Sequence, residues 1–113
     1  ENGNHQGLGL LSGEVGPLDI QKCRVLPHMG WNNLETTEGM RLFEGLPASP
    51  HFYFVHSYHM MHMDPKVQVS HCLYGEEQVV AAFQMDNIYG TQFHPEKSLA
   101  NGIQVLKNFV QHA

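Results

Sequence analysis

Short apolar runs, each bounded by turn-forming residues, occupy the second half of the chain. The run HFYFVHSY, residues 51–58, is dense in aromatic residues, which are enriched in strands. KVQVSHCLY and EQVVAAFQM follow. IYGTQF comes next, after the pair Asp86 and Asn87, which suits a tight hairpin turn. The pattern therefore predicts strands at 51–58, 66–74, 77–85 and 88–93.

The segment before these runs is rich in glycine, asparagine and proline. Residues 1–9 show no regular pattern, whereas 10–15 and 22–26 predict two short strands, the second ended by a proline. The stretch PHMGWNNLE, residues 27–35, surrounds one Trp with Gly and Asn, which is typical of a loop with a large apolar anchor. Residues 37–43 predict one or two helical turns.

Apolar residues recur at helical spacing near the C-terminus, after Ser98, which is a favourable N-cap. The recurring positions are Leu99, Ile103, Leu106, Phe109 and Val110. They predict an amphipathic C-terminal helix that follows a series of strands. This order is unusual for a complete α/β domain, in which strands and helices normally alternate.

Composition narrows the class of protein. At 113 residues, of which 42% are hydrophobic, the chain has the size of one small domain with enough apolar residues for a core. The formal net charge is -5, and the six Lys and Arg residues form no basic run that would follow a phosphate backbone. We therefore expect no nucleic-acid partner.

Targeting and redox signals favour the cytoplasm. No apolar stretch reaches membrane-spanning length and no signal peptide begins the chain, so we expect no membrane partner. Cys23 and Cys72 are too few for a disulfide framework, which favours a reducing cytosol. The chain begins with Glu1 instead of Met, which fits either processing or a piece cut from a longer parent.

One motif, GTQFHPEKS at residues 90–98, indicates a candidate catalytic site. Pro95 pushes His94 into extended backbone at the end of the predicted strand. Residues i and i+2 of an extended chain point to the same side, so His94 and Glu96 should project together. A carboxylate that holds one imidazole nitrogen frees the other, which gives two-thirds of a nucleophilic triad. The spacing alone supports a non-catalytic interpretation equally well, in which a histidine lies beside a surface glutamate at the start of a helix.

The sequence offers no convincing nucleophile for this pair. A catalytic cysteine in an α/β protein usually lies on a tight strand–turn–helix elbow with small neighbours. Cys23 in QKCRVLP has bulky neighbours, and Cys72 in VSHCLYG lies inside a predicted strand with no helix after it. Both are better interpreted as small buried hydrophobic residues.

Other patterns are weaker. His56, His59 and His62 are spaced by three, so on an extended segment they alternate faces and do not converge on a metal. GLGLLSG near the N-terminus lacks the third glycine and the lysine of a phosphate-binding loop. Trp31 fits either a core position or an exposed interface anchor. We therefore expect no metal and no cofactor.

GTQFHPEKS closely resembles the His-Pro-Glu motif of class I, triad-type glutamine amidotransferases. Within that family, LPHMGWNNL at 26–34 and FYFVHSYH at 52–59 resemble the amidotransferase subunits that serve imidazole glycerol phosphate synthesis in histidine biosynthesis. GLGLLSGEV near the start fits the same group. The resemblance covers nearly the whole chain but only about the C-terminal half of such a subunit. The half that carries the glycine-flanked nucleophile elbow and the oxyanion loop is not matched.

The resemblance implies a role for each matching position. His94 would be the general base and acid for a cysteine in the unmatched half, and Glu96 would orient His94. Ser57 and Tyr58 would offer main-chain contacts to bound glutamine. Ammonia would pass through a tunnel into a partner, a TIM-barrel cyclase subunit. The positions that would face this partner are Met29, Trp31, Asn32 and Lys97.

Together these patterns predict an α/β fold, namely the C-terminal part of a three-layer, flavodoxin-like amidotransferase domain, strand-rich with a C-terminal helix. Residues 1–113 would form one partial domain. The implied activity is hydrolysis of glutamine and delivery of ammonia to a cyclase in a heterodimer, with the chain alone inactive for lack of the cysteine. The alternatives are another class I glutamine amidotransferase, against which PHMGW argues, and a non-catalytic binding module that keeps the fold.

Overall fold

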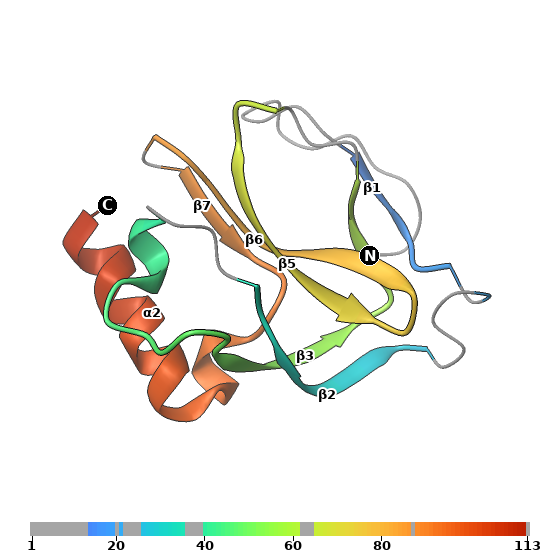
Figure 1. Ribbon diagram of the computed structural model, residues 1–113, viewed down its shortest axis with the longest axis horizontal. Coiled ribbons are helices and arrows are strands. Elements are labelled where there is room, and N and C mark those ends of the chain that lie inside the picture. The colour runs from blue at the N-terminus through green and yellow to red at the C-terminus, as the bar shows by residue number, and fades with distance from the viewer. Residues whose placement is uncertain are drawn as a thin grey trace.

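The computed structural model describes residues 14–19, 21, 26–35, 40–61, 65–86 and 88–112 (Figure 1). The strands are β1 Glu14–Pro17, β2 His28–Asn33, β3 His51–His56, β4 Tyr58–Met61, β5 Gln68–Tyr74, β6 Glu77–Met85 and β7 Ile88–Thr91. The helical elements are the 3-10 turns η1 Arg41–Phe43 and η2 Pro95–Lys97, and the helix α2 Leu99–His112. A strand-rich chain that ends in a helix is the arrangement predicted from the apolar pattern.

The described strands pair in three antiparallel sheets. β1 pairs with β4, β2 pairs with β3, and β5, β6 and β7 form a meander. Gly75, at φ 63°, turns the chain between β5 and β6, in a left-handed conformation that favours glycine. Asp86, at φ 54°, begins the turn predicted between β6 and β7, and Asn87 lies outside the described residues.

β3 supplies the centre of the hydrophobic core. Its side chains alternate, so Phe52 and Phe54 are fully buried whereas Tyr53 and Val55 are half-buried. Phe52 stacks on Phe93, with ring centroids 4.0 Å apart. Other core members are Leu34, Leu42, Cys72, Val79 and Val105. Because the core gathers around β3, this strand fixes the positions of the segments that are hydrogen-bonded to its backbone.

Residues 28–33 form a strand, and the prediction of a loop over 27–35 was wrong there. β2 pairs with β3 along its whole length, from His28 opposite His56 to Asn33 opposite His51. Gly30, opposite Phe54, takes φ 124°, a conformation that would strain any residue with a side chain. Pairing with β3 overrides the local turn preference of Gly and Asn, since strand preference depends strongly on context.

The strand predicted over 51–58 is confirmed but divided. Ser57 forms a bend, so that β3 pairs with β2 whereas β4 pairs with β1. The last predicted strand, 88–93, ends at Thr91. A bend between two strands of different sheets places Ser57 and Tyr58 at a junction, which matters for the site below.

Several predictions near the N-terminus can be compared only in part. η1 forms one turn at the end of the helical region predicted over 37–43, and residues 36–39 lie outside the described residues. The predicted strand 10–15 is described only from Glu14, where β1 begins. Of the predicted strand 22–26, only the last residue is described, and it lies in a bend.

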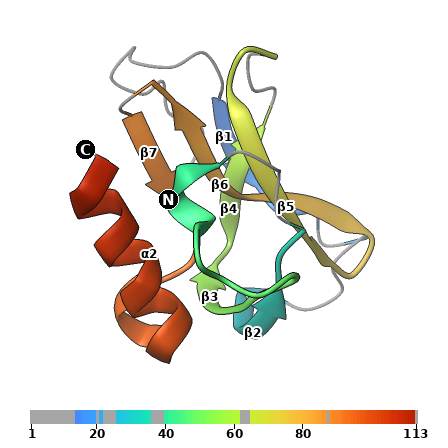
Figure 2. The ribbon, with the colours of Figure 1, turned by 60° about the vertical axis from the view of Figure 1, so that its left-hand side comes forward.

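α2 packs through Gly102, Val105 and Asn108 and turns its apolar stripe outward. The buried Asn108 amide donates to the carbonyl oxygens of Leu42 and Glu44, at 2.9 and 2.8 Å. Figure 2 shows α2 at one side of the strands, next to η1. The outer stripe, Leu99, Ile103, Leu106, Phe109 and Val110, is exposed by 73%, 55%, 44%, 42% and 77%.

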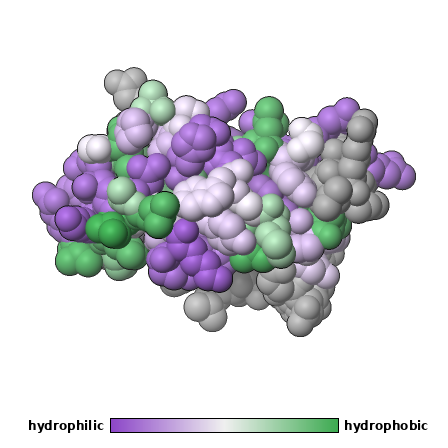
Figure 3. Space-filling view, turned by 90° about the horizontal axis from the view of Figure 1, so that it is seen from below, coloured by the Kyte–Doolittle hydropathy of each residue, from purple (hydrophilic) through white to green (hydrophobic). Residues whose placement is uncertain are grey.

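The outer stripe contributes to a hydrophobic area at the α2 end of the molecule (Figure 3). Contiguous apolar surface of this kind usually marks a contact with another polypeptide. No helix within the described ranges is long and apolar enough to cross a membrane.

Gly102 allows α2 to lie against the segment that carries His94 and Pro95. A Cβ at position 102 would lie 1.8 Å from the Pro95 carbonyl oxygen, which is a backbone atom that a rotamer change cannot move. Gly102→Ala should therefore lower the free energy of unfolding by about 1–3 kcal/mol, the usual cost of overpacking. Urea unfolding followed by circular dichroism measures this change.

The sign of the Gly102→Ala effect is diagnostic. In an exposed helix interior the same replacement stabilises by about 1 kcal/mol, because alanine is the better helix former. Ile103→Ala, at the next and exposed position, is the control and should change stability by about 0.5 kcal/mol or less. A Gly102→Ala protein more stable than the parent would contradict the close approach of α2 to Pro95.

Candidate active site

His94 and Glu96 lie within hydrogen-bonding distance, as the sequence predicted. The His94 Nδ1 atom is 3.1 Å from the Glu96 Oε2 atom. His94 has extended backbone, φ -99° and ψ 99°, but Glu96 belongs to the 3-10 turn η2 that Pro95 begins. The two side chains therefore meet across a tight turn and not along an extended strand, which is the part of the geometric argument that was wrong.

The Glu96 carboxylate fixes which nitrogen of His94 carries the proton. The pKa of Glu96 is lowered, first by its own backbone N–H and then by the hydrogen bond from His94, so the carboxyl is ionised at neutral pH. An ionised carboxylate only accepts, so Nδ1 of His94 donates, and in the neutral imidazole it is Nε2 that carries the lone pair. The His94 side chain is 35% exposed, which leaves that lone pair within reach of a reacting group.

Ser98 ties the His94 turn to β3. Its hydroxyl donates to the His94 carbonyl oxygen at 2.6 Å and accepts the Tyr53 N–H at 2.9 Å. The Tyr53 carbonyl oxygen in turn accepts the His94 N–H at 2.9 Å. The predicted N-cap is right for the backbone, because the Ser98 carbonyl accepts the Gly102 N–H, but the hydroxyl serves the turn instead. Sequence reasoning did not identify Tyr53 as the anchor of this turn.

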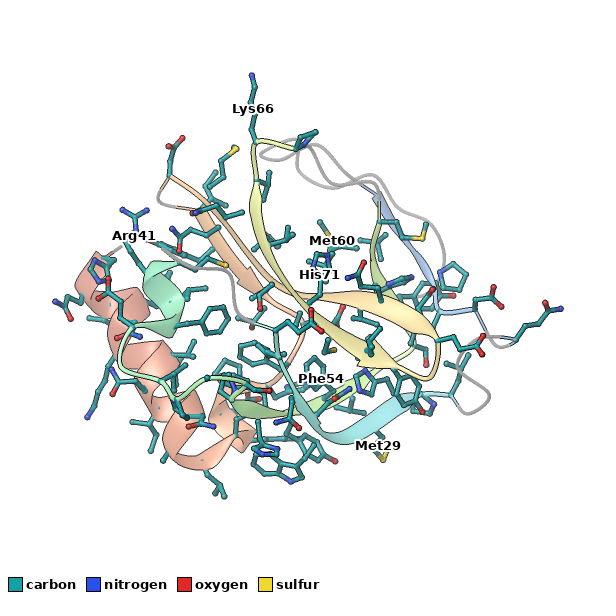
Figure 4. The ribbon with its side chains drawn as sticks, viewed as in Figure 1. Met29, Arg41, Phe54, Met60, Lys66 and His71 are labelled. Carbon is teal, nitrogen blue, oxygen red and sulfur yellow. The ribbon has the colours of Figure 1, made fainter. Side chains whose placement is uncertain are left out.

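Met29 and Trp31 lie on the outer face of β2, exposed by 60% and 49%, and Figure 4 shows Met29 pointing away from the fold. The Trp31 ring packs edge-on against Tyr53, with centroids 6.0 Å apart. Because Tyr53 also holds His94, Trp31 lies beside the candidate catalytic turn. Of the two interpretations left open for Trp31, a core position is excluded.

The other two residues predicted at a partner surface differ from each other. Lys97 is exposed, directly after Glu96. Asn32 is half-buried, and its amide nitrogen donates to the Leu73 carbonyl oxygen at 2.7 Å. Met29, Trp31 and Lys97 are therefore exposed, whereas Asn32 faces β5.

Ser57 and Tyr58 form the junction between β3 and β4. The Ser57 carbonyl oxygen accepts the Leu18 N–H at 2.8 Å. The Tyr58 carbonyl oxygen accepts a hydrogen bond from Nδ1 of His56, also at 2.8 Å. Both carbonyl groups of this bend are therefore held by the chain itself, so the bend has a defined shape before any ligand binds.

Cys72 does not complete a triad with His94. It is 1% exposed in β5, and burial raises the pKa of its thiol to about 12. A thiol with that pKa is almost entirely protonated at neutral pH and is a poor nucleophile, so Cys72 is a core residue. Cys23 lies outside the described residues.

Histidines elsewhere in the described ranges have neighbours of their own. His59 is 5% exposed, with its Nε2 atom 3.3 Å from the Glu77 carboxylate, and burial lowers its pKa. No group of three metal-ligating side chains is arranged for a metal within the residues that are described. His62, the third of the predicted spacing, is not among them.

Comparison with known proteins provides independent evidence on the family of this chain. A family model described as glutamine amidotransferase class-I matches residues 4–113. The chain is 45% identical to the imidazole glycerol phosphate synthase subunit HisH of Gloeothece citriformis, over 97% of this chain and 53% of that protein. It is 44% identical to the corresponding subunit of Cyanophora paradoxa, over 100% of this chain and 53% of that protein.

The chain thus spans about half the length of the curated relatives it matches. In fold, it is similar to a crystal structure described as a GMP synthase subunit from Thermoplasma acidophilum. The TM-score is 0.67 at 20% identity, over 88% of this chain and 47% of that one. The strand-rich arrangement with a C-terminal helix is therefore that of part of a known α/β fold. With a family model matching nearly its entire length, the chain belongs to the class-I glutamine amidotransferase family.

Proposed function

We propose that this chain is the base-bearing part of an amidotransferase that hydrolyses glutamine and delivers ammonia for imidazole glycerol phosphate synthesis in histidine biosynthesis. The observation that carries the proposal is the His94–Glu96 hydrogen bond of 3.1 Å, in a chain of the class-I family. The similarity to HisH subunits at 40–45% identity supports this branch of the family.

His94 acts as base and then as acid. Its Nε2 atom takes the proton of a cysteine thiol, and the thiolate attacks the side-chain carbonyl carbon of glutamine. The imidazolium gives that proton to the departing nitrogen, so ammonia leaves and a glutamyl thioester remains. His94 then deprotonates a water that releases glutamate and restores the thiol. Glu96 keeps His94 in the tautomer with Nδ1–H and stabilises the imidazolium at both stages.

Ser57 and Tyr58 hold the bound glutamine through main-chain groups. β3 connects this bend to Tyr53, which anchors His94, so substrate and base are positioned from one strand. Met29, Trp31 and Lys97 face a cyclase partner, a TIM barrel, and Asn32 supports that surface from behind. An exposed Trp packed beside the base suits such an interface, because Trp is enriched at binding hot spots.

Residues 1–113 are one part of the domain, and the remaining segment of a class-I domain covers the outer stripe of α2. Relatives are about twice as long as the chain, so a segment of comparable size is available to do so. A groove of about 400 Å³ along the stripe is lined by Ile103, Leu106, Lys107, Val110 and Gln111. Each Leu or Ile removed from water there stabilises the contact by about 1.5–3 kcal/mol. The same segment carries the cysteine.

The chain alone should hydrolyse no glutamine, because the described residues hold a base and its acid but no reactive thiolate. Fusing it to the segment of the Gloeothece citriformis relative that it does not span, with the cyclase present, should restore ammonia release. His94→Ala in this completed protein should lower kcat at least about a thousand-fold, since triad members act as a unit. Ammonia release from glutamine, coupled to glutamate dehydrogenase, measures all of these.

Cys72→Ser in the completed protein is the matched control. Because Cys72 is buried and its thiol protonated, the variant should keep kcat within about threefold. Robust turnover by the chain alone, or loss of turnover in Cys72→Ser with the fold intact, would mean that the nucleophile lies in this chain. A completed protein that binds glutamine without hydrolysing it would support the non-catalytic binding module instead.

The outer stripe of α2 has its own test. Ile103→Glu combined with Leu106→Glu should weaken binding of the separately expressed missing segment about 100-fold or more, because two charges would be buried without partners. Isothermal titration measures the affinity. Ala48→Glu combined with Ala100→Glu adds the same charge at exposed positions that do not line the groove, and should cost less than about fivefold. Equal losses for both double variants would contradict docking on the stripe.

A further inference from the structure

Two buried histidines face each other across the β2–β3 pair. His28 and His56 are directly opposite in the register and are 2% and 3% exposed. The His28 Nδ1 atom is 2.7 Å from the His56 Nε2 atom. The His28 ring is stacked between Phe54 and Tyr74, with centroids 4.6 and 4.1 Å away. These two imidazoles have no part in the chemistry assigned to His94.

Two carbonyl groups fix the direction of every hydrogen bond in this cluster. The His56 Nδ1 atom lies 2.8 Å from the Tyr58 carbonyl oxygen, which only accepts, so Nδ1 of His56 carries the proton. Neutral His56 then accepts at Nε2, so His28 donates from Nδ1. At the other end, the Asn32 amide nitrogen donates to the Leu73 carbonyl oxygen, which rules out the flipped amide.

The second proton of that Asn32 nitrogen points to His28, whose Nε2 atom lies 3.3 Å away and accepts. All three bonds therefore run one way, from Asn32 to His28 to His56 to the Tyr58 carbonyl oxygen. Protonating either ring would set two donors against each other within this series. Burial, and to a smaller extent the neighbouring His56, lowers the pKa of His28 to about 4, so the His28 ring is neutral at physiological pH.

We infer that Asn32, His28 and His56 are positioning residues that set the place of the Ser57–Tyr58 bend for substrate glutamine. The inference rests on the proposed function and deepens it. Leu18 holds the bend at the Ser57 carbonyl, and His56 holds it at the Tyr58 carbonyl. Without the His56 bond, the Tyr58 carbonyl loses the hydrogen bond that ties this bend to the buried His28–His56 pair.

We call the series of hydrogen bonds from Asn32 through His28 and His56 to the Tyr58 carbonyl oxygen the relay. The relay acts on substrate binding and does not act on His94. His94 is held by Tyr53 and Ser98, and none of the three relay bonds involves those residues. Main-chain contacts to unreacting parts of glutamine are made equally in the ground state and the transition state. Losing them therefore raises KM and leaves kcat unchanged.

Two replacements of His56 separate positioning from space filling. His56→Phe keeps the ring but removes the donor to Tyr58, whereas His56→Asn loses volume but keeps a nitrogen near the place of Nδ1. In the completed, cyclase-bound protein, His56→Phe should raise KM for glutamine about tenfold, with kcat within about twofold. His56→Asn should raise KM by no more than about threefold. His112→Phe, remote at the end of α2, is the control and should match the parent.

The reverse order, with His56→Asn the worse enzyme, would show that the ring only fills space and would overturn the inference. A measurement on the unsubstituted chain covers the case in which the variants do not fold. Long-range ¹H–¹⁵N correlation spectra at pH 7 should show both His28 and His56 as neutral Nδ1–H tautomers. Either ring protonated at Nε2 would overturn the relay.

Failure of the inference and failure of the proposed function give different results. Absence of turnover in the unsubstituted completed protein would overturn the proposed function, and the positioning role would fall with it. Turnover in that protein, together with an unchanged KM in His56→Phe, would overturn the positioning role alone.

Discussion

The structure depends on one peptide position, Tyr53 in β3, which binds the candidate catalytic turn through both its N–H and its carbonyl oxygen. Its carbonyl oxygen accepts the His94 N–H, and its N–H donates to the Ser98 hydroxyl, which itself donates to the His94 carbonyl oxygen. These bonds close a contact between positions more than forty residues apart. They also set the start of α2, because the Ser98 carbonyl accepts its first helical bond.

β3 serves the core and the candidate site with its two faces. Phe52, Phe54 and His56 point inward, and the first two build the aromatic core with Phe93. His56 continues the same face but is polar, and burying it is tolerable because both ring nitrogens have partners. On the other face, the Tyr53 ring packs against Trp31. β3 therefore relates the Ser57–Tyr58 bend, the candidate base and the proposed partner surface to one another.

The inner face and the outer stripe of α2 are in different environments. Inside the described residues it is held by polar contacts, chiefly the Asn108 amide on the carbonyl oxygens of Leu42 and Glu44, and by the close approach of Gly102 to Pro95. Its outer stripe stays exposed, although the Phe109 ring packs edge-on against Tyr89. Apolar surface of this extent is costly in water, which supports the proposed contact between the stripe and a further segment.

The sequence by itself determined what depends on neighbouring residues. Periodicity predicts the strands that the structure has at 51–56, 68–74 and 77–85, and the C-terminal helix. Pro95, which lies between His94 and Glu96, predicts that these two side chains meet. Even there, the tight turn of η2 replaced the extended geometry that was expected. Family membership could also be predicted from the sequence, because the residues of the His-Pro-Glu motif are consecutive in the chain.

Only the tertiary structure decided what depends on pairing between distant segments. Gly and Asn in 28–33 favour a turn locally, but twelve backbone positions in register, six on each strand, make β2 a strand against β3. That register brings His28 onto His56 and places Asn32 behind them, which no spacing in the sequence reveals. The outward direction of the α2 stripe was likewise undetermined, since helical periodicity defines an apolar face but not what that face meets. Local sequence fixes which residues share a side, whereas contacts between sides are set by the packing of the whole chain.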